Sequence, residues 1–246
     1  KFQKPKDHVL EKYKKLRKDH NDYLILESEK VILYAHKMDF TFEEIIANND
    51  FYKEHPNINA KAYYILEKHK LKEIIGYNSH GGVFALIKKP AEKTQIADRV
   101  LILDNLTSPE NVGSICRSAS AFGFNTVIYN SKGVSPYLRR CIRVSTGHVL
   151  NLNILKSSSI KNKICELKEN NYNIISCHNS KQSKDLEDYS KNIKKLCLII
   201  GSEGHGISDD LIKLSNVSIK IKTHENVEHL NASNASSIIM HYFKKY

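Results

Sequence analysis

An arginine at a fixed spacing from an asparagine and a glycine is the first candidate for chemistry. Asn111, Gly113 and Arg117 follow the pattern N-x-G-x-x-x-R, one turn after the apolar run at 99–104. A positioned guanidinium can bind or polarise a hydroxyl nucleophile, which needs activation at neutral pH, although its pKa above ~12 makes it an awkward base. A structural interpretation stays open, in which Asn111 caps a helix that begins at about Val112 and Arg117 faces water.

A glycine-rich turn is the second candidate. An apolar run at 196–201 leads into Gly201, Glu203, Gly204 and Gly206. Glycines let a backbone approach a ligand closely. The order fits neither the dinucleotide pattern G-x-G-x-x-G nor a phosphate loop ending in G-K-[ST]. A nucleotide-phosphate enzyme that uses this glycine-rich loop is nevertheless kept as an alternative. Glu203 could also be no more than a charge at a helix start.

The third candidate is the C-terminal segment 217–243, which ends in an amphipathic helical pattern. Asn231 stands where that helix should start, and His229 can donate a hydrogen bond, carry charge or act as a base near neutrality. The alternative for the helix is a purely structural core element. Because His224 and His229 have no matching third ligand, we expect no metal site.

The elements that must position these residues form two regions. Pro90 and polar residues mark a boundary, so we expect a small α/β domain at 1–90, a linker at 91–98 and a second domain at 99–246. In the first domain, 61–70 is helix-like and 22–28, 73–78 and 82–87 are β-like. In the second, β-like runs at 99–104, 125–130, 173–177, 196–201 and 217–221 alternate with helix-like stretches at 112–122, 159–170 and 208–215. That alternation predicts a parallel sheet covered on both faces.

Charge and cysteine content restrict the class of protein. The chain has 246 residues and a net charge of +11, which favours polyanionic partners such as nucleic acid, although a lysine-rich composition alone would give the same value. Five scattered cysteines favour a reducing compartment. We expect no membrane span and an intracellular location: the cytoplasm, or a mitochondrion or plastid if a targeting peptide preceded Lys1.

All three segments resemble the motifs of the SpoU (TrmH) family of RNA ribose 2′-O-methyltransferases, in the SPOUT superfamily. "LDNLTSPENVGSICR" is similar to its first motif, "GSEGHG" to its second motif G-[SA]-E-G-x-G, and 217–243 to its third. The resemblance covers roughly 99–243. It implies S-adenosylmethionine as cofactor, no metal, a homodimer and a C-terminal parallel-sheet domain with a trefoil knot.

The resemblance also implies roles for the matching residues. Arg117 would contact the reacting ribose and Asn111 would order the site. The cofactor would be held by Gly201, Ile221 and Leu230, with Glu203 as a buttress and Asn231 near both cofactor and arginine. Two positions depart from the family: Lys222 replaces the usual proline, and His229 replaces a serine. We hypothesise that His229 shares in activating the hydroxyl; family drift is the alternative.

RNA contacts are expected from both domains. "RVSTG", which begins at Arg143, is similar to a family stretch, and Arg139, Arg140 and Arg143 could bind phosphates, unless this is an exposed structural helix. The segment around Arg17 resembles the opening of the family's RNA substrate-binding domain, with Ser28 in place of a glycine. That domain favours rRNA over tRNA as substrate. A catalytically inactive RNA-binding dimer with the same fold remains the alternative.

Overall fold

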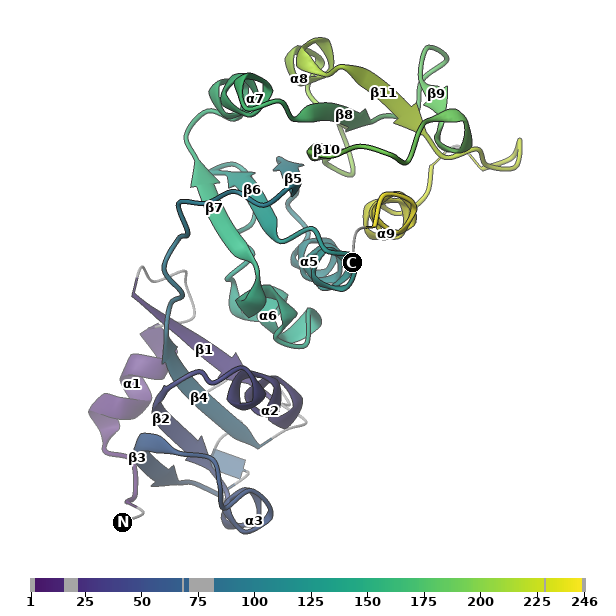
Figure 1. The fold of residues 1–246 in the computed structure, drawn as a ribbon. Coiled ribbons are helices and arrows are strands. Elements are labelled where there is room, and N and C mark those ends of the chain that lie inside the picture. The colour runs from purple at the N-terminus through teal and green to yellow at the C-terminus, as the bar shows by residue number, and fades with distance from the viewer. Residues whose placement is uncertain (1–2, 16–21, 68, 71–81, 228, 245–246) are drawn as a thin grey trace. The chain divides into compact units, whose positions relative to one another are not determined.

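The structure is a computed structural model that describes residues 3–15, 22–67, 69–70, 82–227 and 229–244. The chain forms two compact units (Figure 1): unit 1 contains Lys1–Ala91 and Tyr137–Leu150, and unit 2 contains Glu92–Pro136 and Asn151–Tyr246. Unit 1 therefore includes a segment that the sequence analysis placed in the second domain. Among the described residues, none of the helices has the length and apolar character that a membrane span needs.

Unit 1 is built on a four-stranded mixed sheet in the order β1-β4-β2-β3. Its helix α1 packs against one face through Val9 and Tyr13. The strands are β1 (Tyr23–Glu27), β2 (Phe42–Ala47), β3 (Ala60–Ile65) and β4 (Val83–Lys88), and the helices are α1 (Asp7–Lys15), α2 (Glu29–Lys37), α3 (Asn49–Glu54) and α6 (Arg139–Val144). The 3-10 turn η1 (His148–Asn151) follows α6.

One helix expectation in unit 1 was wrong. The segment 61–70 looked helical, but Ala60–Ile65 forms β3 and pairs in parallel with β2. Tyrosines and an isoleucine fit a pleated sheet, and pairing with a neighbouring strand overrides the helix propensity of Ala and Lys. The expected strand at 73–78 lies outside the described residues.

Unit 2 is the expected parallel α/β structure. Its seven strands have the order β7-β6-β5-β10-β8-β11-β9, and every neighbouring pair is parallel. The strands are β5 (Arg99–Asp104), β6 (Thr126–Asn130), β7 (Asn153–Ser157), β8 (Asn173–Cys177), β9 (Lys184–Asp185), β10 (Leu196–Gly201) and β11 (Val217–Lys220). The helices are α5 (Pro109–Ala121), α7 (Ile160–Glu169), the short η2 (Leu186–Asp188), α8 (Asp209–Leu214) and α9 (Ala232–Tyr242).

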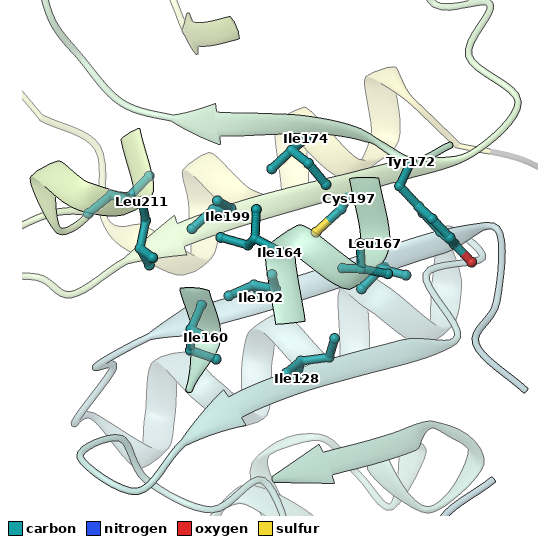
Figure 2. Close-up of a cluster of buried hydrophobic side chains, with 12 residues drawn as sticks. Ile102, Ile128, Ile160, Ile164, Leu167, Tyr172, Ile174, Cys197, Ile199 and Leu211 are labelled. Atoms are coloured by element: carbon teal, nitrogen blue, oxygen red, sulfur yellow. The ribbon is translucent and has the colours of Figure 1, made fainter. Parts of the chain in front are cut away.

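Both faces of the central strands of unit 2 are buried. Figure 2 shows Ile160, Ile164 and Leu167 of α7 pointing onto alternate residues of the sheet, including Ile102 and Ile199. The intervening residues of β5 and β10 point to the opposite face and are also buried. That second face lies on the side of the paired helices α5 and α9. The continuous hydrophobic runs in the sequence reflect this double burial.

The helix start that precedes Arg117 differs from the expectation. Ser108 is the N-cap of α5, accepting a hydrogen bond from the N–H of Asn111, and Pro109 occupies the first turn. Proline suits that position because it needs no backbone donor there. Asn111 is thus inside the first turn of the helix, and its side chain is available for other contacts.

A buried arginine anchors the C-terminal helix to the sheet. Arg99 of β5 donates to the backbone carbonyls of Phe243, Lys194 and Ile193 at distances of 3.2, 2.9 and 2.7 Å. Burial lowers the pKa of its guanidinium, partly offset by nearby Asp98. The carbonyl of Phe243 ends α9, where the helix dipole favours a cation.

Candidate active site

The cavity of unit 2 lies at the carboxyl ends of β8, β10 and β11. Its volume is about 630 Å³, within the usual range for small-molecule sites. Open parallel α/β sheets bind ligands at this edge. The cavity is lined by Gly201, Ile221 and Leu230, the three residues expected to hold the cofactor, and by Glu203, His229 and Asn231. The glycine-rich turn and the C-terminal segment, which are separate in sequence, therefore meet at one cavity.

Gly201 begins a loop that folds back on itself. Ser202 and Gly206 exchange two backbone hydrogen bonds, of 3.0 and 2.9 Å. A Cβ at position 201 would lie 2.2 Å from the carbonyl carbon of Gly206, so any other residue would displace backbone. Gly206 has φ of +66°, a conformation that side chains rarely adopt. The glycines thus allow a tight turn against the cavity wall.

Three side chains, one from each of the three motifs in the sequence, form one hydrogen-bonded chain. The Nδ2 of Asn111 donates to Oε1 of Glu203 at 2.6 Å, and the Nδ2 of Asn231 donates to Oδ1 of Asn111 at 3.1 Å. The carboxylate can only accept, so it fixes which way the Asn111 amide faces. This contact ties the first turn of α5 to the glycine loop.

Asn231 completes that chain at the start of α9. Its Oδ1 accepts from the backbone N–H groups of Ser233 and Asn234 and from the hydroxyl of Ser233. The expected position of Asn231 at the helix start is confirmed: it is the N-cap. Because the Oδ1 of Asn231 accepts hydrogen bonds from the first turn of α9, its amide nitrogen points toward Asn111. The helix start therefore sets the geometry of the whole chain.

Arg117 lies exposed on α5, and His229 is exposed at the cavity. Among the described residues, the set that lines the cavity excludes Arg117 and includes His229 and Asn231. A hydrogen bond of 2.7 Å between Ser118 and Ser237 joins α5 to α9 next to Arg117. The arrangement leaves the guanidinium accessible to a large substrate.

The sequence analysis missed several residues of the cavity. Cys177 ends β8 and is followed by His178 and Asn179, and at the same edge of the sheet Lys220 ends β11 and Thr223 follows it. The available signal was topological, since residues just after a central parallel strand belong at the ligand edge. Burial raises the pKa of the Cys177 thiol well above its usual range, which keeps it protonated and a poor nucleophile.

The arginines proposed as RNA contacts have different surroundings. Within unit 1, Nε of Arg139 and Nη1 of Arg143 each lie 3.2 Å from the carboxylate of Glu27, whose side chain is 1% exposed. Arg140 lies between them in sequence and is exposed. Arg17 lies outside the described residues. Two of the four candidates thus help to neutralise a buried acid.

The sequence of unit 2 matches a known family. The model of the SpoU rRNA Methylase family aligns with residues 98–241, more than half of the chain. The chain belongs to this family. Residues 98–241 of this SpoU family protein include the Glu203–Asn111–Asn231 chain and the cavity-lining segments of unit 2.

Relatives and solved structures extend the likeness beyond unit 2. An uncharacterized tRNA/rRNA methyltransferase of Mycobacterium bovis is 24% identical over 183 residues, which are 72% of this chain and 64% of that protein. The SpoU methyltransferase AviRb of Streptomyces viridochromogenes, solved with AdoMet, has a TM-score of 0.81 and 18% identity over 96% of this chain and 97% of its own. An RNA 2′-O ribose methyltransferase structure has a TM-score of 0.80 and 18% identity, covering 98% and 97%. At this identity the likeness establishes the fold.

Proposed function

We propose that this protein is an S-adenosylmethionine-dependent RNA methyltransferase that methylates a ribose 2′-hydroxyl, with rRNA as the favoured substrate. The observation that carries the proposal is the single cavity at which the second and third family motifs meet, and to which Asn111 of the first motif is joined by hydrogen bonds to Glu203 and Asn231. Family membership supports methyl transfer to RNA, and the structure of the 2′-O ribose methyltransferase supports the choice of atom.

The cavity suits S-adenosylmethionine. Its volume of about 630 Å³ fits a molecule of that size, and the missing side chain at Gly201 leaves backbone directly at the wall. Gly201, Ile221 and Leu230 line the cavity and would contact the cofactor there. When bound, this cofactor supplies an electrophilic methyl group on a sulfonium.

The protein's own contribution is mainly positioning. Arg117 would bind the ribose and its adjoining phosphate, and the chain from Glu203 to Asn231 would keep α5 at a fixed distance from the cavity. Fixing a nucleophile in line with its target removes much of the entropic barrier. His229, exposed at the cavity, would help to polarise or deprotonate the hydroxyl.

Replacement of Arg117 tests the proposal. Arg117→Ala should lower methyl transfer to RNA by at least about 100-fold and leave the Kd for S-adenosylhomocysteine nearly unchanged, because the residue lies outside the cavity lining. Lys168→Ala, which removes an exposed cation from α7, is the matched control. Nucleoside mass spectrometry of treated rRNA and tRNA identifies the modified atom and the substrate. Methylation of a base, or a loss of cofactor binding in Arg117→Ala, would contradict the proposal.

The role of His229 has its own test. If this imidazole takes part in activating the hydroxyl, His229→Ala should lower the turnover number several-fold and flatten its dependence on pH between 6 and 9. His205→Ala is a suitable control, since His205 also lines the cavity and is exposed. Full turnover of His229→Ala across that range would remove the histidine from the mechanism.

Lys222 and His229, the two departures from the family pattern, motivate a second candidate: a non-catalytic RNA-binding dimer. Lys222 is exposed just after Ile221 of the cavity wall. Calorimetry with S-adenosylmethionine separates the two candidates, because an adaptor would bind RNA without binding the cofactor.

We also infer from the family a homodimer and a knotted C-terminal segment. A solution mass of one chain by light scattering would contradict the dimer.

A further inference from the structure

A buried carboxylate behind the cavity belongs to none of the groups assigned so far. Asp104 ends β5 and is 2% exposed. In the parallel ladder it stands directly beside Gly201, the residue that begins the glycine loop. Among the described residues, those that line the cavity do not include Asp104. Any influence of this acid on a bound molecule must therefore pass through its neighbours.

One oxygen of Asp104 holds the far end of the glycine loop. Its Oδ2 accepts a hydrogen bond from the N–H of Ser208 at 2.9 Å and another from the Ser208 hydroxyl at 2.7 Å. Ser208 precedes α8 and follows the loop that starts at Gly201. Both ends of the loop that carries Glu203 are thus fixed on one residue: by the strand ladder at Gly201 and by the carboxylate at Ser208.

The other oxygen of Asp104 faces the turn that leads into α5. Its Oδ1 accepts from the amide nitrogens of Asn105 at 2.9 Å and Asn130 at 3.5 Å. Asn105 has φ of +57°, an unfavourable conformation that neighbouring contacts must hold. The amide of Asn130 also donates to Oδ1 of Asn105 at 3.0 Å. This turn sets where α5, with Asn111 and Arg117, begins.

We propose that Asp104 is a positioning residue, whose carboxylate fixes the glycine loop and the start of α5 relative to each other and so shapes the cofactor cavity. The proposal rests on the proposed function. A buried carboxylate is stable only when its lone pairs are satisfied. Its four donors are two groups of Ser208 at the end of the glycine loop, the amide of Asn105 in the turn before α5, and the amide of Asn130 at the end of β6. Asp104 touches neither substrate nor cofactor, and acts through Ser208 and Asn105.

Asp104→Asn is the sharpest variant because it keeps the size of the side chain. The amide replaces one of the two acceptor oxygens with an NH2 donor, whereas Ser208 donates to one oxygen of Asp104 and the amide nitrogens of Asn105 and Asn130 donate to the other. Asn130 cannot reverse its amide without losing the bond that its Oδ1 accepts from the N–H of Gly133. We expect the Kd for S-adenosylhomocysteine to rise by roughly tenfold, the equivalent of one buried hydrogen bond to a charged group.

Thr126→Val is the matched control, and Ser208→Ala is a milder variant. Thr126 is also fully buried and accepts a hydrogen bond from the N–H of Ala97, but at the amino end of β6, away from the cavity. Thr126→Val should lower the melting temperature without changing the Kd. Ser208→Ala removes the hydroxyl but keeps the N–H contact, so it should raise the Kd by about threefold with a smaller loss of stability.

The outcomes are distinguishable. A larger Kd in Asp104→Asn than in Thr126→Val, at a similar melting temperature, supports the positioning role. An unchanged Kd in Asp104→Asn overturns it. If Asp104→Asn does not fold, Ser208→Ala decides by the same comparison. If the wild-type protein itself does not bind S-adenosylhomocysteine, the proposed function fails and this proposal fails with it.

Discussion

Among the described residues, each unit of the molecule buries one carboxylate at the end of a strand, and the two are satisfied in different ways. Glu27 at the end of β1 is neutralised by the guanidinium groups of Arg139 and Arg143. Asp104 at the end of β5 is held by a backbone N–H, a hydroxyl and two amides. The ion pairs join β1 to α6, the helix of the later segment Tyr137–Leu150 that completes unit 1. The neutral network shapes a loop at a cavity.

The comparison shows that a basic motif in a sequence does not identify its partner. Arg139 and Arg143 have the charge and spacing that a phosphate site needs, yet their guanidinium groups face a buried acid of the same unit. A charge used to balance a buried group is costly to remove, whereas an exposed charge is not. The predictions below use this difference in cost.

The largest effect is expected at Glu27. Glu27→Gln leaves two partly buried guanidinium groups without their carboxylate, so it should lower the free energy of unfolding of unit 1 by about 3 kcal/mol. Urea unfolding measures the loss. The cavity is lined by residues of unit 2, so the Kd for S-adenosylhomocysteine should stay unchanged. A larger Kd for S-adenosylhomocysteine at an unchanged free energy of unfolding would show that Glu27 contributes to the binding site rather than to the fold.

The next largest effect is expected at Arg99, the buried cation of unit 2. Arg99→Lys keeps the charge but loses the fixed fork of N–H donors. A single ammonium group cannot reach all three carbonyls that the guanidinium binds. We expect a loss of about 2 kcal/mol in the free energy of unfolding, with earlier hydrogen exchange in α9. Lys194→Arg, at an exposed side chain in the segment whose carbonyls Arg99 binds, controls for the substitution itself. Unchanged exchange in α9 would mean that this anchor contributes little.

A smaller effect separates the arginines of α6. Arg140→Ala should weaken RNA binding by a few-fold and reduce the slope of log Kd against log salt by about 1, with little change in melting temperature. Arg139→Ala should instead lower the melting temperature, because it removes a partner of Glu27. Filter binding across a salt series and thermal melts measure the two quantities. If Arg139→Ala shows the larger loss of RNA affinity at unchanged stability, the division of roles is wrong.

The sequence predicted the central strands of unit 2 closely because burial on both faces leaves continuous apolar runs. β7 escaped notice because it is an edge strand, where Asn153, Lys156 and Ser157 interrupt the pattern. The meeting of Gly201, Ile221 and Leu230 at one cavity could be expected only from the family resemblance. No local pattern reveals that Glu27 faces Arg139, since that contact depends on how distant segments pack.

The smallest effect is expected at an exposed ion pair in unit 2, between Lys161 of α7 and Asp210 of α8. The hydrogen bond from Lys161 and its charge lower the pKa of Asp210 below the ordinary value, so any stabilisation is present at neutral pH and disappears as the pH falls through the folded-state pKa. Because both side chains are more than half exposed, water and salt screen the pair. Asp210→Asn should therefore leave the melting temperature at pH 7 within error of wild type, in contrast to Glu27→Gln. A melting-temperature loss in Asp210→Asn as large as that in Glu27→Gln, which disappears as the pH falls through the lowered pKa, would show that burial is not what distinguishes these acids.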